Sequence, residues 1–307
     1  MSQASLSLEG RTAVVTGAAR GLGHAHALAL ASRGARVVAL DVIDGSDAVA
    51  AIEGIGGHAE SLIVDLADAR AADDAIARVL DSHGDVHVLV NNAGAVRDRM
   101  SFNLSTADWE HVLAVNLSAT FHLSAAMART WRECSGTDHR RRSIVNTASE
   151  SGLYGNPGQA NYAAAKAGVA ALTLTMAAEL HRYGVRVNAI VPRARTPMSE
   201  QAFGVLPRDG SVDRFAPEHV AQVVAWLASD AAADVSGRVL LVHGASVALM
   251  RTWSVEREVP RQGALSDDEL LGLRDRLFPD GAGQRLASPI GQLFVGATHA
   301  RGESSDG

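Results

Sequence analysis

The stretch TAVVTGAARGLG, residues 12–23, decides the fold. It opens with an apolar, β-branched run typical of a buried strand, and helical spacing follows it. Three glycines in the turn between them allow tight backbone conformations and the close approach of a ligand. A helix that begins there presents free N–H groups and the positive end of its dipole, which suits a dinucleotide pyrophosphate. The turn residues expected to contact it are Gly17, Arg20, Gly21, Leu22 and Gly23.

From this turn to about residue 242, short strand-like runs alternate with longer helical segments. The strands are expected at 12–16, 36–41, 59–65, 86–91, 143–149, 185–191 and 238–242. The helices are expected at 21–33, 44–55, 68–83, 106–133, 157–182 and 217–229. Such alternation indicates βαβ units, so we expect an α/β, doubly wound, Rossmann-type parallel sheet with helices on both faces.

The composition changes after about residue 250. We expect residues 1–250 to form the dinucleotide-binding catalytic domain and residues 251–307 to form a C-terminal extension. One short helical stretch is expected near 265–277, and the Gly- and Ser-rich end, residues 300–307, is expected to be disordered.

The composition also excludes several classes of protein. A hydrophobic content of 47% excludes wholesale disorder, and a net charge of −6 does not favour nucleic acid or a membrane as partner. The single cysteine, Cys134, excludes a disulfide framework, and the 12 histidines lack metal-ligand spacing, so no metal is expected. No apolar run approaches the ~20 residues of a membrane span, and the N-terminus lacks signal-peptide features. A cytoplasmic protein is expected.

Residues at the ends of later strands extend the expected cofactor site. Asp41 closes the second strand, where its carboxylate would bind an adenosine ribose and repel a 2′-phosphate. NAD is therefore expected in preference to NADP, although Arg20 favours the opposite, and Asp41 could be an ordinary turn residue. The other expected cofactor contacts here are Asp65, Leu66, Asn92, Ala93 and Gly94.

Lys166 is the only lysine among the 28 basic residues of the chain. It follows Tyr162 by four residues, which places the two side chains on one face of a helix. A nearby ammonium favours the phenolate and lowers the tyrosine pKa from ~10. The pair can then act as a general acid and base on an alcohol or carbonyl. The alternative is a surface pair without chemistry.

Two further polar residues complete the expected catalytic group. Ser149 follows the fifth strand, where its hydroxyl could hold a substrate oxygen beside Tyr162, with Ser151 as its competitor. Asn116 lies within a helical segment, although Asn is a poor helix former. It is expected to hold a water that connects Lys166 to solvent, unless it is a satisfied core asparagine.

These motifs together resemble the short-chain dehydrogenase/reductase family. The resemblance covers residues 11 to about 250 and rests on the glycine turn, Asn91–Gly94, Asn116, Ser149, Tyr162 and Lys166. It implies a seven-stranded sheet, NAD(P)-dependent hydride transfer and a catalytic tetrad formed by the last four residues. In the family, the tyrosine and the lysine also contact the cofactor. Homodimers or homotetramers are expected to form through the long helices at 106–133 and 157–182.

The sequence departs from the family pattern after the sixth strand. The family usually has Pro-Gly and then a Thr five residues after the Pro, whereas here Arg193 follows Pro192 and Thr196 comes one residue early. Pro192 and Thr196 are still expected to contact the nicotinamide. Arg193 and Arg195 flank the expected substrate mouth as candidate handles for an acidic group, and residues 140–142, all Arg, are expected in a solvated loop.

The stretch at residues 192–197, together with residues 242–253, is similar to a subgroup that includes the 3-hydroxyacyl-CoA dehydrogenase domain of the multifunctional β-oxidation enzyme. The expected activity is NAD-dependent hydride transfer between nicotinamide and a secondary alcohol or ketone. Candidate small-molecule substrates are a 3-hydroxyacyl thioester, a steroid or another bulky alcohol. Two alternatives stay open: an NADPH-dependent 3-oxoacyl reductase, and a protein that senses dinucleotide without turnover.

Overall fold

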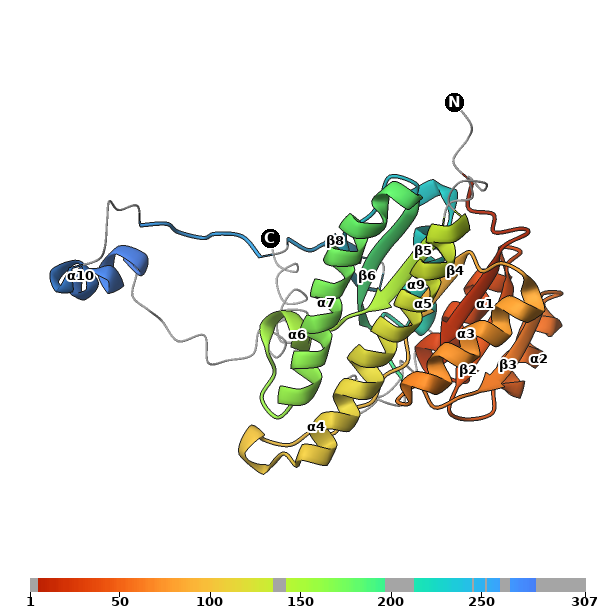
Figure 1. Cartoon of the computed structure of the whole chain (residues 1–307), viewed down its shortest axis with the longest axis horizontal. Coiled ribbons are helices and arrows are strands. Elements are labelled where there is room, and N and C mark those ends of the chain that lie inside the picture. Colours follow the sequence, from red (N-terminus) through yellow and green to blue (C-terminus); the bar gives the residue numbers. More distant parts are fainter. Residues whose placement is uncertain are drawn as a thin grey trace, which may run out of the picture. The chain divides into compact units, whose positions relative to one another are not determined.

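A computed structural model of the chain describes residues 5–134, 142–196, 213–244, 246–251, 253–259 and 266–279 (Figure 1). The chain divides into two compact units, one ending at Met250 and the other beginning at Arg251. In the second unit, α10 (Asp267–Leu277) begins with a capping box between Ser266 and Glu269. Residues 300–307, expected to be disordered, lie outside the described residues.

The first unit is built on one sheet with the strand order β3-β2-β1-β4-β5-β6-β7-β8. Its strands are β1 (Thr12–Thr16), β2 (Arg36–Asp41), β3 (His58–Ile63), β4 (Val88–Asn91), β5 (Arg142–Thr147), β6 (Val185–Arg193), β7 (Val239–His243) and β8 (Ser246–Leu249). The first seven pair in parallel, which confirms the doubly wound Rossmann-type fold. β8 is antiparallel to β7, so the expected count of seven strands was one too few.

Helices cover both faces of the sheet (Figure 1). One face carries α1 (Gly21–Ala31), α2 (Ser46–Gly54) and α9 (Pro217–Ala228). The opposite face carries α3 (Ala69–His83), α5 (Ala119–Cys134) and α7 (Ala160–Leu180). All residues of β1 and β4 are buried, because helices pack on them from both sides. Each fully buried Val or Leu side chain contributes roughly 1.5–3 kcal/mol of hydrophobic stabilisation.

The segment expected as one helix at 106–133 has an interruption. It consists of α4 (Thr106–Leu113), a π-helical turn at Ala114–Ser118, and α5. Such a turn holds one extra residue and is frequent at functional sites. Here it contains Asn116, the polar residue that the sequence singles out. A short helix, α6 (Glu150–Tyr154), also precedes α7.

The helix α7 and the turn that follows it, Ala160–Tyr183, have the length and composition of a membrane span. This corrects the expectation that the chain has no such run. Val169 and Met176 of α7 are buried against the sheet, however, and Thr173 is hydrogen-bonded to Asn146 of β5. α7 is therefore a core helix of this fold, in which apolar residues on several sides are ordinary.

Polar side chains are paired at the amino edge of the sheet, where the parallel strands begin. Arg142, expected in a solvated loop, is buried at the start of β5 and lies 3.2 Å from the Asp85 carboxylate. The rest of that loop, residues 140 and 141, lies outside the described residues. Nδ1 of the buried His87 accepts a hydrogen bond from the backbone N of Thr12 at 3.1 Å.

Candidate active site

The predicted site residues gather at the carboxyl ends of the parallel strands. The strand order reverses between β1 and β4, and sheets of this kind bind ligands at such a point. Thr16 connects the two strands, because its Oγ1 accepts hydrogen bonds from the backbone N atoms of Asn92 and Ala93, both at 2.9 Å. Nδ2 of Asn92 donates in return to the Thr16 carbonyl at 3.0 Å. These bonds fix the strand ends on either side of the expected dinucleotide site.

The glycine turn has the conformation that its sequence predicts. Gly17 and Gly21 have φ values of +64° and +57°, in the left-handed region that favours glycine. A Cβ on Gly23 would overlap the carbonyl oxygen of Gly17, so no side chain fits there. α1 begins at Gly21 without a capping side chain, and the exposed Arg20 precedes it. The first-turn N–H groups of α1 are thus available to a pyrophosphate.

Asp41 lies at the end of β2 beside this turn. Its Oδ2 accepts a hydrogen bond from Ala19 N at 3.0 Å, and its Oδ1 accepts one from Ile43 N at 3.3 Å. Asp41 therefore holds the turn, and it also presents a carboxylate where the ribose contact is expected. At the end of β3, Asp65 is exposed and Leu66 is buried.

Tyr162 and Lys166 lie on the first turns of α7. Nζ of Lys166 is 5.6 Å from the centroid of the Tyr162 ring and donates to the Thr147 carbonyl at 2.8 Å. Lys166 is 3% exposed, and burial lowers its pKa to about 8. A Cβ on Gly94 would lie 3.8 Å from this Nζ and 2.8 Å from Oδ1 of Asn116. The compact ammonium thus occupies a space that a wide guanidinium would not fit.

The pKa of Tyr162 differs from the expectation. Burial raises it to about 12, a hydrogen bond with Ser149 lowers it, and the carboxylate of Asp98 raises it. The lowering of this pKa that was expected from Lys166 is not among its causes, and because burial dominates, the phenol is protonated at neutral pH. Asp98 belongs to no motif in the sequence, and its influence on Tyr162 became evident only from the fold.

The structure distinguishes the two candidate serines. Ser149 caps α6, accepting a hydrogen bond from the backbone N of Ser151 at 3.2 Å, and it also hydrogen-bonds Tyr162. The hydroxyl of Ser151 instead donates to Oε1 of Gln159 at 2.8 Å. Nε2 of Gln159 donates in turn to Asp98 at 2.9 Å. Ser149 is therefore the serine beside Tyr162, and Ser151 belongs to a network at the edge of the site.

Asn116 is fully buried in the π-helical turn. Its Nδ2 donates to the carbonyl oxygens of Ala95 and Val112 at 2.8 and 2.9 Å. Its Oδ1 has no hydrogen-bond partner among the described residues. A buried acceptor in this state is suited to a water or a ligand hydroxyl.

Arg193 at the end of β6 and Arg195 just after it are not free handles for a substrate. Nε and Nη2 of Arg193 donate to the two oxygens of the buried Glu150 at 2.7 and 2.6 Å. Arg195 pairs similarly with Asp213, at 3.3 and 3.4 Å. The expectation that these arginines hold an acidic group was wrong, because carboxylates far away in the sequence already bind them. Pro192 and Thr196, the expected nicotinamide contacts, flank this stretch.

The donor set fits a dinucleotide better than a metal ion. The glycine turn leaves no room for side chains, Asp41 lies beside it, and Oδ1 of Asn116 is an unused buried acceptor near Lys166. Within the part of the chain that the structure describes, no three His, Cys, Asp or Glu side chains are placed to hold a metal ion.

Comparison with known proteins gives the same picture. A family model described as short chain dehydrogenase matches residues 11–203. The hydroxyacyl-CoA dehydrogenase ChsB1 of Mycobacterium tuberculosis is 45% identical over 273 residues, which cover 85% of this chain and 86% of that protein. The 3-oxoacyl-[acyl-carrier-protein] reductase FabG of Thermotoga maritima is 37% identical over 254 residues, which cover 79% of this chain and 100% of that protein.

Solved structures of dehydrogenases are also similar to this chain. A short chain dehydrogenase from Mycobacterium avium superposes with a TM-score of 0.82 at 37% identity, over 91% of this chain and 98% of that one. A candidate 2-deoxy-d-gluconate 3-dehydrogenase from Agrobacterium tumefaciens, solved with bound NADP, has a TM-score of 0.69 at 36% identity. This match covers 78% of this chain and 97% of that one.

Proposed function

This chain belongs to the short-chain dehydrogenase family and is an oxidoreductase, and we propose that it oxidises the 3-hydroxyl of an acyl-CoA thioester with NAD. The observation that carries the proposed substrate is the 45% identity to a hydroxyacyl-CoA dehydrogenase across 85% of the chain. We place this activity in the cytoplasm, with a small-molecule substrate and with neither nucleic acid nor membrane as partner. The dehydrogenases and reductases among the relatives do not support the alternative of a sensor without turnover.

Several residues are proposed to hold the cofactor. The N–H groups at the start of α1 bind the pyrophosphate, and Asp41 binds the adenosine ribose. NAD is favoured because the Asp41 carboxylate would repel a 2′-phosphate. Pro192 and Thr196 contact the nicotinamide, whose C4 accepts the hydride when the cofactor is bound.

The proton is moved by the residues at the start of α7. Ser149 positions the substrate oxygen, and Tyr162 exchanges the proton with that oxygen at its hydroxyl. Lys166, held on the Thr147 carbonyl, stabilises the phenolate, and Asn116 holds the water that connects Lys166 to solvent. Because the pKa of Tyr162 is about 12, the fraction of phenolate increases with pH, and alcohol oxidation is expected to accelerate between pH 7 and 9.

The test is a substrate screen with NAD⁺, including a 3-hydroxyacyl-CoA and simple secondary alcohols, that follows the absorbance of NADH. Tyr162→Phe should reduce kcat by about 10²–10⁴-fold, because the proton donor and acceptor is lost. NADH binding should be unchanged, since the ring is retained. A wild-type protein that binds NADH tightly but turns over no alcohol would refute the proposal and support the sensing alternative.

The second candidate is an NADPH-dependent 3-oxoacyl reductase. It is favoured by the 37% identity to FabG, by the related structure with bound NADP, and by the exposed Arg20 at the glycine turn. A kcat/KM for NADPH about tenfold or more above that for NADH would establish this alternative and overturn the role given to Asp41.

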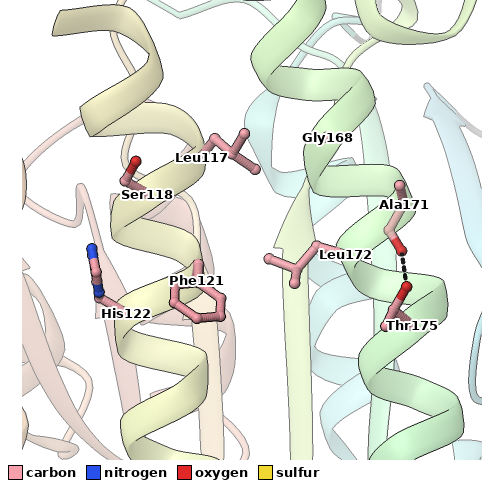
Figure 2. Close-up of a pocket in the computed structure, with 8 residues that line it drawn as sticks. All are labelled: Leu117, Ser118, Phe121, His122, Gly168, Ala171, Leu172 and Thr175. Atoms are coloured by element: carbon pink, nitrogen blue, oxygen red, sulfur yellow. Dashed lines mark hydrogen bonds between the residues drawn. The ribbon is translucent and has the colours of Figure 1, made fainter. Parts of the chain in front are cut away.

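We also propose that two copies associate through α5 and α7. The outer faces of these helices, together with the π-helical turn that precedes α5, form an apolar groove of about 430 Å³ (Figure 2). Its lining residues are Leu117, Ser118, Phe121, His122, Gly168, Ala171, Leu172 and Thr175. Phe121 is half exposed within the groove, which indicates a surface that a partner covers. Analytical ultracentrifugation should show a dimer or tetramer for the wild type and a smaller species for Phe121→Asp.

A further inference from the structure

Next to the proposed site lies a buried ion pair that the reaction outlined above does not use. Arg193 and Glu150 are 8% and 7% exposed, and two parallel hydrogen bonds of 2.7 and 2.6 Å join them. Such a fork-to-fork contact fixes the orientation of both planar groups. A pair of this kind contributes little net stability, because desolvation of both charges offsets their attraction. Its main effect here is geometric.

The pair connects two strands beyond the point where their backbones separate. The β5–β6 ladder ends at Thr147 and Ile190, and one further bond joins Ala148 N to the Ile190 carbonyl at 2.8 Å. Beyond it, the side chains of Glu150 and Arg193 join the two segments. β6 meanwhile continues along β7, where Arg193 is in register with His243.

Both partners lie one residue from a position that the proposed reaction needs. Glu150 directly follows Ser149, whose hydroxyl is to hold the substrate oxygen. Arg193 directly follows Pro192 and comes shortly before Thr196, the expected nicotinamide contacts. Arg193 also stands at the position where the family usually has a glycine. A glycine has no side chain there, so it could not form this ion pair.

We propose that Glu150 and Arg193 form a positioning pair, which fixes the spacing between Ser149 and the segment from Pro192 to Thr196. The pair thereby sets the distance over which hydride passes between substrate and nicotinamide. This inference rests on the proposed function. Neither side chain touches the reacting atoms in this role, so the pair should influence kcat and leave cofactor affinity nearly unchanged.

The surroundings of the pair are consistent with this role. His243 faces it from β7, and burial together with the Arg193 charge lowers the pKa of His243, so this imidazole is neutral at pH 7. The Tyr154 hydroxyl is near Arg193 on the α6 side. Glu150 is thus the carboxylate that balances Arg193 among the described residues nearby.

The sharpest variant is the double replacement Glu150→Leu with Arg193→Met, which keeps the packing and removes both charges. We expect kcat to fall by about 10–100-fold, because misplacement of the reacting groups by ~1 Å costs this much. KM for NAD⁺ should change by less than about threefold, and Tm should stay the same or rise. The single variant Arg193→Lys keeps Glu150 and one charged hydrogen bond to it. Its kcat should therefore lie between those of the double variant and the wild type.

The control is the ion pair at the opposite edge of the sheet, between the buried Arg142 and the partly buried Asp85. The double replacement Asp85→Leu with Arg142→Met should leave kcat unchanged. If both double variants have the wild-type kcat, or if both lose kcat equally, the Glu150–Arg193 pair is merely structural and the inference is overturned.

A binding measurement separates this inference from the proposed function. If the wild type oxidises no alcohol, the proposed function fails, and the fluorescence of bound NADH still tests the pair. A shifted emission maximum with an unchanged Kd in the Glu150→Leu, Arg193→Met variant supports displacement of the nicotinamide. An emission maximum identical to that of the wild type, or no NADH binding by the wild type, overturns the inference.

Discussion

Arg142 and Lys166 are both buried cations, at opposite edges of the same sheet. Arg142 lies 3.2 Å from the carboxylate of Asp85, which compensates its charge. Lys166 donates to the neutral carbonyl of Thr147, and among the described residues no carboxylate forms an ion pair with it. Burial lowers the Lys166 pKa from 10.5 to about 8, a cost of roughly 3 kcal/mol below pH 8. The charge of Lys166 at the carboxyl edge is thus uncompensated by a carboxylate among the described residues, whereas the charge of Arg142 at the amino edge is compensated.

Other buried polar groups show the same contrast. His87 at the amino edge accepts a hydrogen bond from the backbone of Thr12. At the carboxyl edge, Oδ1 of Asn116 has no partner among the described residues, and burial raises the pKa of Tyr162 to about 12. Around Tyr162, Lys166 and Asn116, the carboxyl edge therefore keeps charged and polar groups that stability alone would not favour, as is frequent at functional sites.

The largest expected effect comes from exchanging the two types of cation. Lys166→Arg should reduce kcat by about a thousandfold, because the guanidinium does not fit opposite Gly94 and displaces Asn116. Arg142→Lys should leave kcat unchanged and lower the free energy of unfolding by about 1–3 kcal/mol, since one Asp85 contact is weakened. Steady-state kinetics and urea unfolding measure the two effects. Loss of kcat in both variants would mean that the edges do not differ in function.

A smaller effect is expected from the charge beside the glycine turn. Asp41→Asn keeps the hydrogen-bond acceptor for Ala19 and removes the charge that repels a 2′-phosphate. The ratio of kcat/KM for NADP⁺ over NAD⁺ should increase by about tenfold or more. Asp65→Asn is the matched control after the next strand: Asp65 is expected to contact a part of the cofactor that NAD⁺ and NADP⁺ share, so the ratio should be unchanged. If the ratio were the same in the wild type and in Asp41→Asn, Asp41 would not select the cofactor, and its role would be to hold the glycine turn.

The smallest expected effect concerns two buried histidines. His26 in α1 is fully buried, neither of its ring nitrogens has a partner among the described residues, and burial lowers its pKa to about 3. Between pH 6.5 and 3 the unfolded chain binds a proton at His26 that the folded chain does not. The free energy of unfolding therefore decreases as the pH falls through this range, by about 1.4 kcal/mol per pH unit.

His26→Leu should remove this dependence, which urea unfolding at pH 7, 6 and 5 would measure. His87→Leu serves as the comparison, because it deprives the buried Thr12 N–H of its acceptor and should cost about 1–3 kcal/mol at pH 7. A His26→Leu variant that loses stability toward pH 5 as steeply as the wild type would contradict the assignment.

Much of the fold was predictable, because a parallel strand that is buried on both faces has a continuous apolar run in its sequence. β1 and β2 begin and end at the predicted residues. β8 was missed because its apolar run, residues 247–249, is only three residues long, which is shorter than a typical strand. The π-helical turn was missed as well, because one extra residue in a helix leaves the apolar spacing on either side intact.

The candidate site was predictable where its chemistry depends on rare residues at fixed spacing, as with the solitary Lys166 four residues after Tyr162. It was not predictable where partners come from distant segments. Nothing in the sequence connects Arg193 to Glu150, and the raised pKa of Tyr162 depends on burial that only the folded chain creates.

The exclusive use of arginine elsewhere in the chain has a practical consequence. The only side-chain amine of the whole sequence lies in the proposed catalytic cluster. With a pKa of about 8, a substantial fraction of that amine is unprotonated and nucleophilic in mildly alkaline buffer. An acylating reagent at that pH therefore has a single internal amine to modify, and mass spectrometry of the peptide that contains it can report whether the pocket is occupied.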